Sequence, residues 1–252
     1  MSQEKVALVT GVSSGIGRAI AGLLSRHGFR VFGTERGNAG ATRALENVER
    51  VHVDVREEES IHSCLRTVLD RAGRIDVLVN NAGYTMIGSL EETTIDEAKG
   101  LFETNFFGVL RMTQAVLPFM RGQRSGRIIN IGSVVGFVPA PYQGIYCASK
   151  HALEGYSESL DHEVRQLGIR VSVIEPGFTR TNIAQNSHVI AHPLEAYTPV
   201  AALTISGRTR GQVRQPAAQI CSFKSLRQGP SKTVSTGCRL NTGQQIFLTQ
   251  TK

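Results

Sequence analysis

The stretch YCASK contains a phenol at Tyr146 and an ammonium at Lys150, four residues apart. If this segment is helical, the two side chains lie on the same face, one turn apart. A free phenol titrates near pH ~10, and a cation beside it lowers that pKa because it stabilises the phenolate. The pair therefore has the chemistry of a proton donor and its activator, although an ordinary helix surface with a hydrogen-bonded Tyr and a solvated Lys has the same spacing.

Three glycines form a second informative group, in the stretch TGVSSGIGRAI. Gly11, Gly15 and Gly17 follow an apolar run and open a helical pattern, where helix amides and the helix dipole can receive a pyrophosphate. Glycine also lets the backbone approach the phosphate closely. The GxxxGxG spacing differs from the common GxGxxG fingerprint, and a flexible loop is the alternative. The strand-turn-helix context favours a dinucleotide site.

Six short runs rich in Val and Ile must position these groups. Four of them come after a glycine and a basic residue, which indicates a helix stop followed by a buried strand. The strands are expected near residues 5–9, 30–34, 50–53, 75–79, 126–131 and 169–174. Helical spacers separate most of them, which predicts a parallel sheet covered on both faces, a doubly wound, Rossmann-like α/β fold.

The helix after YCASK has the clearest periodicity. Its apolar residues recur at three- and four-residue steps: Leu153, Tyr156, Leu160, Val164 and Leu167. The Tyr/Lys pair therefore lies at the beginning of this helix. We expect a single domain over residues 1–200 and an atypical basic tail over residues 201–252.

Composition narrows the class of protein. The 252 residues are 40% hydrophobic and 19% charged, and no apolar run reaches the roughly 20 residues of a membrane span, so we expect a cytoplasmic protein without a signal peptide. The four cysteines lack metal or disulfide spacing, so no metal is expected. Eight of the 28 basic residues lie at 196–252, where there is no acid. Stacking aromatics are nearly absent there, so we expect no nucleic-acid partner.

Several short motifs occur together in one order: TGVSSGIG, NNAG at 80–83, Asn105, Ser133, YCASK, and PG at 176–177. In this combination the chain resembles the short-chain dehydrogenase/reductase family, over roughly residues 5–195. The stretch YCASKHALEGYSESL is most similar to the branch with hydroxysteroid and retinol dehydrogenases. The resemblance implies hydride exchange between a nicotinamide cofactor and a secondary alcohol or ketone, steroid-like and retinoid-like substrates included.

The resemblance also implies roles for four side chains. Tyr146 would carry the proton, and Lys150 would lower its pKa and bind the nicotinamide ribose. Ser133 would hold and polarise the substrate oxygen, and a turn cap is the alternative role for its hydroxyl. Asn105 would hold a water in a proton path to the lysine, with a buried structural hydrogen bond as the alternative.

By resemblance, the cofactor contacts lie at the carboxyl ends of the strands. They are Gly11, Ser13, Ser14, Gly15, Ile16, Gly17, Glu35, Arg36, Asp54, Val55, Asn80, Ala82, Gly83, Tyr146, Lys150, Pro176, Gly177 and Thr181. Asp54 has an alternative role as a turn-forming residue.

The end of the second strand bears on the choice between NAD and NADP. An acid there accepts hydrogen bonds from the ribose hydroxyls of NAD, whereas an arginine meets the extra phosphate of NADP. Glu35 occupies the acid position and Arg36 the next, while Ser14 lacks the basic side chain that many NADP enzymes of the family carry. We expect NADP, with NAD as the alternative.

Residues 178–200 correspond to the family's variable substrate lid, and their composition specifies no substrate. Residues 203–252 lack the helix and seventh parallel strand that the family has at this point, so we expect an irregular tail and an exposed sixth strand. The segment QQIFLTQ is a weak candidate for a replacement strand. A homo-oligomer is expected only if this region permits one, and a cofactor-binding but catalytically impaired protein is the alternative function.

Overall fold

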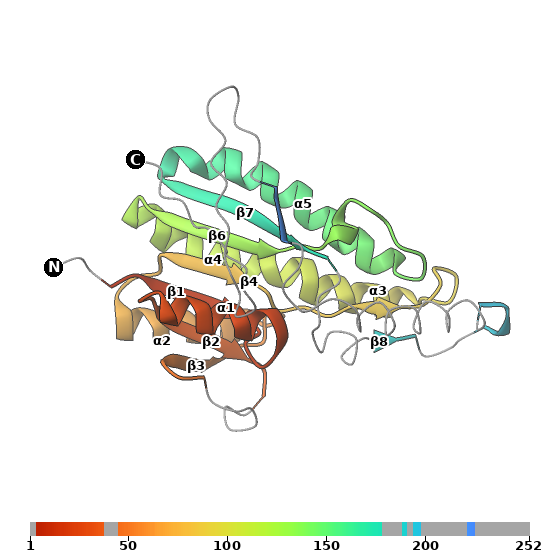
Figure 1. The fold of residues 1–252 in the computed structure, drawn as a ribbon, viewed down its shortest axis with the longest axis horizontal. Helices are drawn as coiled ribbons and strands as arrows, with labels where there is room; N and C mark the ends of the chain where they lie inside the picture. Colours follow the sequence, from red (N-terminus) through yellow and green to blue (C-terminus); the bar gives the residue numbers. More distant parts are fainter. Residues whose placement is uncertain (1–3, 38–44, 178–187, 191–193, 198–220, 225–252) are drawn as a thin grey trace.

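The computed structural model describes residues 4–37, 45–177, 188–190, 194–197 and 221–224. Within these ranges one large sheet is covered by helices on both faces (Figure 1). Its strands are β1 (Val6–Thr10), β2 (Arg30–Glu35), β3 (Val48–His52), β4 (Val77–Asn80), β6 (Gly126–Ile131), β7 (Ile169–Pro176) and β9 (Cys221–Lys224). The α-helices are α1 (Gly15–Arg26), α2 (Glu58–Ala72), α3 (Ile95–Phe102), α4 (Gly108–Gln123) and α5 (Gly144–Val164).

The strand order of the sheet is β3-β2-β1-β4-β6-β7-β9. The first six of these strands are parallel, so their carboxyl ends meet at one edge. The succession of strands reverses direction between β1 and β4, and ligands of such folds bind outside the carboxyl ends at this reversal. The glycine loop that follows β1 lies at that point. The doubly wound, Rossmann-like sheet predicted from the sequence is confirmed, with strand bounds within two residues of those expected.

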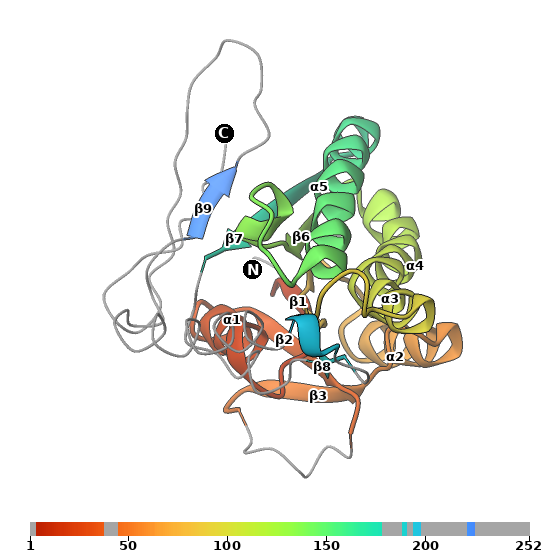
Figure 2. The same ribbon diagram turned by 90° about the vertical axis from the view of Figure 1, so that its right-hand side faces the viewer.

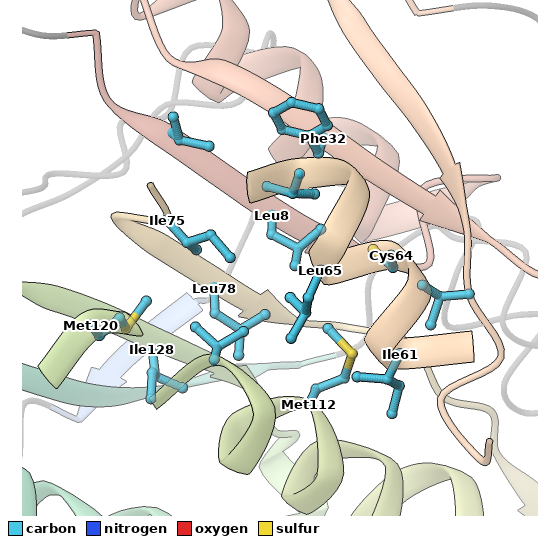
Figure 3. Close-up of a cluster of buried hydrophobic side chains, with 14 of the residues drawn as sticks. Leu8, Phe32, Ile61, Cys64, Leu65, Ile75, Leu78, Met112, Met120 and Ile128 are labelled. Carbon is cyan, nitrogen blue, oxygen red and sulfur yellow. The ribbon is translucent and has the colours of Figure 1, made fainter. Parts of the chain in front are cut away.

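Two apolar clusters bury the faces of the sheet. On one face β1, β2 and β4 pack against α2, α4 and α5, and Figure 3 shows the side chains of Leu8, Leu65 and Leu78 in this cluster. On the other face Ala7, Val9 and Val31 pack with Ala21 and Leu24 of α1. Among the helices of the described ranges, Figure 2 shows α1 on one side of the sheet and α2, α4 and α5 on the other.

Neighbouring residues of β1 belong to opposite clusters, Leu8 to the first and Val9 to the second. This follows from the two-residue period of a strand. Because both faces are covered, Val6 to Val9 form a continuous apolar run, and Thr10 at the carboxyl end is the one polar residue of the strand. Each fully buried aliphatic side chain contributes roughly 1.5–3 kcal/mol of burial free energy, which holds the strand ends in fixed positions around the site.

The C-terminal half of α5 is fastened to β7 by the buried carboxylate of Asp161. Its Oδ1 accepts hydrogen bonds from the backbone N–H of Val171, at 2.9 Å, and from Nε of Arg170, at 2.9 Å. Its Oδ2 accepts one from Nη2 of Arg165, at 2.8 Å. Burial raises the pKa of Asp161, but these donors outweigh burial and the net pKa lies below its usual range. Apolar packing and the hydrogen bonds of Asp161 thus both hold the helix that carries the Tyr/Lys pair against the sheet.

The edge of the sheet beyond β7 differs from expectation. β9 pairs antiparallel with the last part of β7, in a register that joins Val173 to Lys224 and Pro176 to Cys221. The expected bare edge is therefore wrong for this part of β7, because a short strand from the tail satisfies its backbone groups. The other residues of the tail, the segment QQIFLTQ included, lie outside the described residues.

Shorter elements complete the carboxyl edge. α3 begins with a capping box in which Thr94 and Glu97 exchange side-chain and backbone hydrogen bonds. A π-helical turn, Glu103–Phe107, joins α3 to α4. A two-stranded sheet pairs β5 (Met86–Ile87) with β8 (His188–Val189), and 3-10 turns occupy Val134–Gly136, Arg165–Leu167 and Glu195–Tyr197. None of the helices in the described ranges combines the length and apolarity needed to cross a bilayer.

Candidate active site

Tyr146 and Lys150 lie in the first turns of α5, and both side chains are buried. Nζ of Lys150 lies 5.8 Å from the centroid of the Tyr146 ring and donates a hydrogen bond of 2.7 Å to the carbonyl oxygen of Ile131. Burial lowers the pKa of Lys150 to about 8, and the nearby carboxylate of Glu154 opposes this shift. An ammonium near a phenol favours the phenolate form, which is the chemistry that a proton donor at this position would need.

Ser133 follows β6 by two residues and caps the 3-10 turn Val134–Gly136. Its Oγ accepts a long hydrogen bond, 3.4 Å, from the N–H of Val135. The turn-capping role that the sequence left open is therefore present. The serine is only partly buried at the carboxyl edge of the sheet, two residues from the carbonyl that Lys150 binds. Turn capping and contact with a substrate oxygen are compatible, because the hydroxyl still has a proton to donate.

The loop that carries Ser133 lies directly on α5. A Cβ added to Gly132 would lie 2.8 Å from Oε1 of Glu154 and 2.7 Å from Cγ1 of Val173. A Cβ added to Gly136 would lie 3.3 Å from the backbone oxygen of Lys150. A side chain at Gly132 would force its neighbours to shift, so glycine favours this close approach of the serine loop to α5.

Asn105 lies in the π-helical turn and is almost fully buried. Its Nδ2 donates to the carbonyl oxygen of Tyr84 at 2.9 Å, and its Oδ1 accepts the N–H of Tyr84 at 3.1 Å. The structural hydrogen bond considered as the alternative role is thus present. A single π turn inside a helix is frequent at functional sites because it rearranges backbone carbonyls. The same side chain crowds Gly83, whose added Cβ would lie 2.9 Å from Oδ1.

The glycine loop is shaped to receive an anion. Gly11 and Gly15 have φ values of +72° and +60°, in the left-handed region that favours glycine. Ser14 is the N-cap of α1, but its side chain makes no capping hydrogen bond, and the first turn of α1 contains no acid. The helix amides and the positive end of the helix dipole are therefore available to a phosphate group. Ser13 is exposed and Ile16 is partly buried beside them.

Asn81 and Thr10 hold this loop in place by hydrogen bonds. Neither residue is among the site residues expected from the sequence. Nδ2 of Asn81 donates to the carbonyl oxygens of Thr10, at 2.9 Å, and Gly11, at 3.0 Å. Oγ1 of Thr10 accepts the N–H groups of Asn81, at 2.9 Å, and Ala82, at 3.0 Å. A Cβ on Gly17 would collide with the Asn81 amide. The loop is thus held against the NNAG segment.

Asn80, which we expected to contact the cofactor, has its side chain on the opposite side of β4. Its Nδ2 donates to Oδ1 of Asn130, at 2.9 Å, and to Oγ1 of Thr113, at 3.2 Å. The amide is 2% exposed and belongs to a buried polar network that continues from Asn130 to Ser157. Any contact of Asn80 with a cofactor would come from its backbone.

Asp54 and Val55 follow β3. Arg56 holds the Asp54 carboxylate with Nε at 2.9 Å from Oδ1 and Nη2 at 2.5 Å from Oδ2. This hydrogen bonding lowers the pKa of Asp54 to about 2. The backbone N–H of Arg56 also donates to Oδ1, at 3.0 Å, which is the local turn that the sequence left open. Val55 is buried against Gly108 of α4.

The acid and the arginine at the end of β2 have different environments. Glu35 is buried and forms an ion pair with Arg50 of β3, at 3.1 Å. Arg36 is exposed. Pro176 ends β7 and Gly177 follows it at the same edge of the sheet, whereas Thr181 lies outside the described residues.

Two described segments of the expected lid contact the α3 region. Nε2 of His188 lies 3.2 Å from Oε1 of Glu97, and the N–H of Leu194 donates to Oε1 of Glu92 at 2.6 Å. They place part of residues 178–200 over the carboxyl edge. In the part of the chain that the structure describes, no three His, Cys, Asp or Glu side chains form a group that could hold a metal.

The sequence matches the family described as short chain dehydrogenase over residues 5–189. The 3-ketodihydrosphingosine reductase of Bacteroides thetaiotaomicron is 43% identical over 190 residues, 74% of this chain and 68% of that protein. The 3-oxoacyl-(acyl-carrier-protein) reductase FabG of Vibrio harveyi is 42% identical over 187 residues, 73% of this chain and 77% of that protein. The similarity to the hydroxysteroid and retinol branch stays a prediction.

Solved structures agree in fold. A short-chain dehydrogenase from Streptomyces avermitilis superposes with a TM-score of 0.73 at 40% identity, over 86% of this chain and 79% of its own. A Burkholderia phymatum short chain dehydrogenase/reductase in complex with NAD gives 0.73 at 27% identity, over 86% and 83%. ElxO with NADP bound gives 0.67 at 28% identity, over 73% and 77%.

Proposed function

Because the chain belongs to the short-chain dehydrogenase family, we propose that it reduces a ketone to a secondary alcohol, or the reverse, with Tyr146 as the acid and base. A nicotinamide dinucleotide supplies or accepts the hydride when it is bound. The protein then has to hold the substrate oxygen and exchange one proton with it. The observation that carries this proposal is the buried Tyr146–Lys150 pair next to the Ser133 loop.

The residues fit such a cofactor. Gly11 has a left-handed backbone and an added Cβ there would meet Ala82 and Asn81, and the α1 terminus has no side-chain cap. We infer that Gly11, Gly15 and Gly17 hold the pyrophosphate, as the family resemblance implies. Asn81 and Thr10 then act as positioning residues, because Asn81 holds the carbonyls of Thr10 and Gly11 and the Thr10 hydroxyl holds the N–H groups of Asn81 and Ala82.

Each polar side chain has a task in the proposed reaction. The Tyr146 hydroxyl donates its proton to the carbonyl oxygen during reduction, and the Lys150 ammonium stabilises the phenolate that forms. Ser133 donates a hydrogen bond to the same substrate oxygen and polarises the carbonyl. Asn105 ties the π turn to Tyr84 and keeps this wall of the site in place; we propose in addition that it holds the water of a proton path to Lys150.

NADP is the cofactor that we propose, with NAD as the alternative. The exposed guanidinium of Arg36 can form charge-assisted hydrogen bonds with the ribose phosphate. Titration of wild type and Arg36→Ala with both dinucleotides tests this choice. Tighter binding of NADP that is lost in Arg36→Ala supports it, and equal affinity of the two dinucleotides contradicts it.

The substrate class that we propose is an aliphatic ketone. Two of the most similar relatives are named as reductases of a 3-keto and a 3-oxoacyl compound. The alternative of a catalytically impaired protein has no support from these relatives. A screen of 3-oxoacyl thioesters, 3-keto long-chain amines, steroids and retinoids with NADPH and NADH tests the class. Turnover of steroids or retinoids alone would favour the branch suggested by the YCASK helix.

A further inference from the structure

Glu35 and Arg50 form an ion pair at the end of β2, in which Glu35 is buried and Arg50 partly buried. Nη1 of Arg50 lies 3.1 Å from Oε1 of Glu35, and the two side chains are 13% and 6% exposed. Removal of one partner of such an ion pair leaves the other as an uncompensated charge. Arg50 therefore governs the charge that Glu35 presents to its surroundings.

The register of the sheet explains why the two side chains meet. Glu35 pairs with His52 across the ladder, so Arg50 is two residues away along β3 and on the same face. That face is the α1 side, since Val31 of β2 and Val48 of β3 pack in the same apolar cluster as Ala21. The ion pair thus lies on the side of the sheet where the glycine loop enters α1.

Backbone hydrogen bonds bring Glu35 next to that loop. The N–H of Val12 donates to the carbonyl oxygen of Thr34 at 2.9 Å, and the N–H of Val53 donates to that of Glu35 at 3.1 Å. The end of β2 is therefore fixed between the glycine loop and the segment of Asp54. In this fold, an acid here meets the ribose hydroxyls next to the adenine.

The charges around this ribose position decide which dinucleotide fits. A carboxylate without a cationic partner accepts hydrogen bonds from two ribose hydroxyls but repels a phosphate dianion. The ion pair with Arg50 cancels the charge of Glu35 and orients one of its oxygens toward β3. Arg36, the next residue along the chain, then supplies an exposed cation beside the paired acid.

We propose that Arg50 is a specificity-determining residue: by neutralising Glu35 it makes this site select NADP over NAD. The proposal rests on the proposed function, since it concerns the cofactor of that reaction. Arg50 belongs to β3 and is not among the cofactor contacts expected from the sequence. In this proposal it controls the charge of Glu35, an acid that would otherwise favour NAD.

The test is the ratio of the dissociation constants of NAD and NADP, measured by calorimetry without substrate. In Arg50→Gln the carboxylate of Glu35 loses its cation, so we expect the ratio Kd(NAD)/Kd(NADP) to fall about tenfold or more. In Arg50→Gln/Glu35→Gln the charge is gone, and the ratio returns toward that of wild type. An unchanged ratio in Arg50→Gln, or an equal fall in the double variant, overturns the proposal.

Two further variants serve as controls, one for misfolding of Arg50→Gln and one for the loss of any ion pair between β2 and β3. Arg50→Lys retains the cation and should retain the wild-type ratio, so a shift equal to that of Arg50→Gln contradicts the proposal even if Arg50→Gln does not fold. Arg30→Gln removes an ion pair between the same two strands at their other end, Arg30 to Glu49 at 2.7 Å, and should leave the ratio unchanged.

If wild type binds neither dinucleotide, both the proposed function and this inference fail. If wild type binds NADP and the ratio does not respond to Arg50, only this inference fails.

Discussion

Lys150 is tied to the sheet by a hydrogen bond of 2.7 Å from its Nζ to the carbonyl oxygen of Ile131, the last residue of β6. This bond joins the first turns of α5 to the strand that leads to Ser133. The ammonium, the phenol of Tyr146 and the serine loop are therefore parts of one rigid unit. The buried cation has an energetic consequence, because burial opposes its charge.

The first prediction concerns the pH dependence of stability. Burial lowers the pKa of Lys150 from 10.5 to about 8, so the unfolded chain binds more protons than the folded chain between these values. The contribution of Lys150 to the free energy of unfolding must then rise with pH across this window, by up to about 3 kcal/mol. Urea unfolding of wild type and Lys150→Met from pH 7 to pH 10.5 measures it. The difference between the two proteins should grow in favour of wild type, and parallel curves would show that the lysine is not desolvated.

The second prediction separates the two asparagines of NNAG. Asn81→Ala removes two hydrogen bonds to the glycine loop and should weaken dinucleotide binding about tenfold. Asn80→Ala opens a buried polar network and should lower the free energy of unfolding by about 1–3 kcal/mol. Calorimetric titration and urea unfolding of both variants compare the two effects. Weaker binding in folded Asn80→Ala, with Asn81→Ala unaffected, would reverse our assignment.

The third prediction concerns the serine loop. An added Cβ at Gly132 approaches Val173 and the Glu154 carboxylate within 2.8 Å, so Gly132→Ala must shift the loop. We expect kcat to fall about 10²-fold, because small misplacements of a positioning group have effects of this size. Dinucleotide affinity should change little.

Gly155→Ala is the matched control for this change. Gly155 lies on the same helix as Glu154, and no atom comes within 4 Å of its added Cβ. Alanine should stabilise the helix by about 0.5–1 kcal/mol with kcat unchanged. A similar loss of kcat in both variants would mean that the loop is not the sensitive element.

Much of the fold was predictable from local patterns, since six strands and α5 follow from apolar runs and periodicity. The two-residue period also accounts for the NNAG segment: Asn80 shares a face of β4 with Leu78, so its side chain points to the α4 side, and Asn81 is the one that reaches the glycine loop. The period alone therefore distinguishes the two asparagines, without any knowledge of tertiary contacts.

Other features depend on contacts between distant segments. The ion pair of Glu35 with Arg50 follows from the pairing register of β2 and β3, which the sequence does not specify. The same is true of β9, whose short run gives no strand pattern by itself and whose place comes from pairing with β7. Asn105 in the π turn makes two hydrogen bonds to Tyr84, 21 residues away, and such a contact cannot be predicted from local sequence.

The most direct test of the central claim is single-turnover reduction of a verified ketone by Tyr146→Phe, monitored by loss of NADPH absorbance and compared with wild type. Phenylalanine retains the ring that packs in the buried cluster with Met86 and Leu101 but removes the proton donor. We predict that the rate of the chemical step falls by at least about 10²-fold, while the Kd of the dinucleotide changes less than about twofold, since the hydroxyl of Tyr146 is the one expected cofactor contact that is lost and the ring stays in place. A rate near that of wild type, with the dinucleotide bound, would contradict the assignment of Tyr146 as the acid and base.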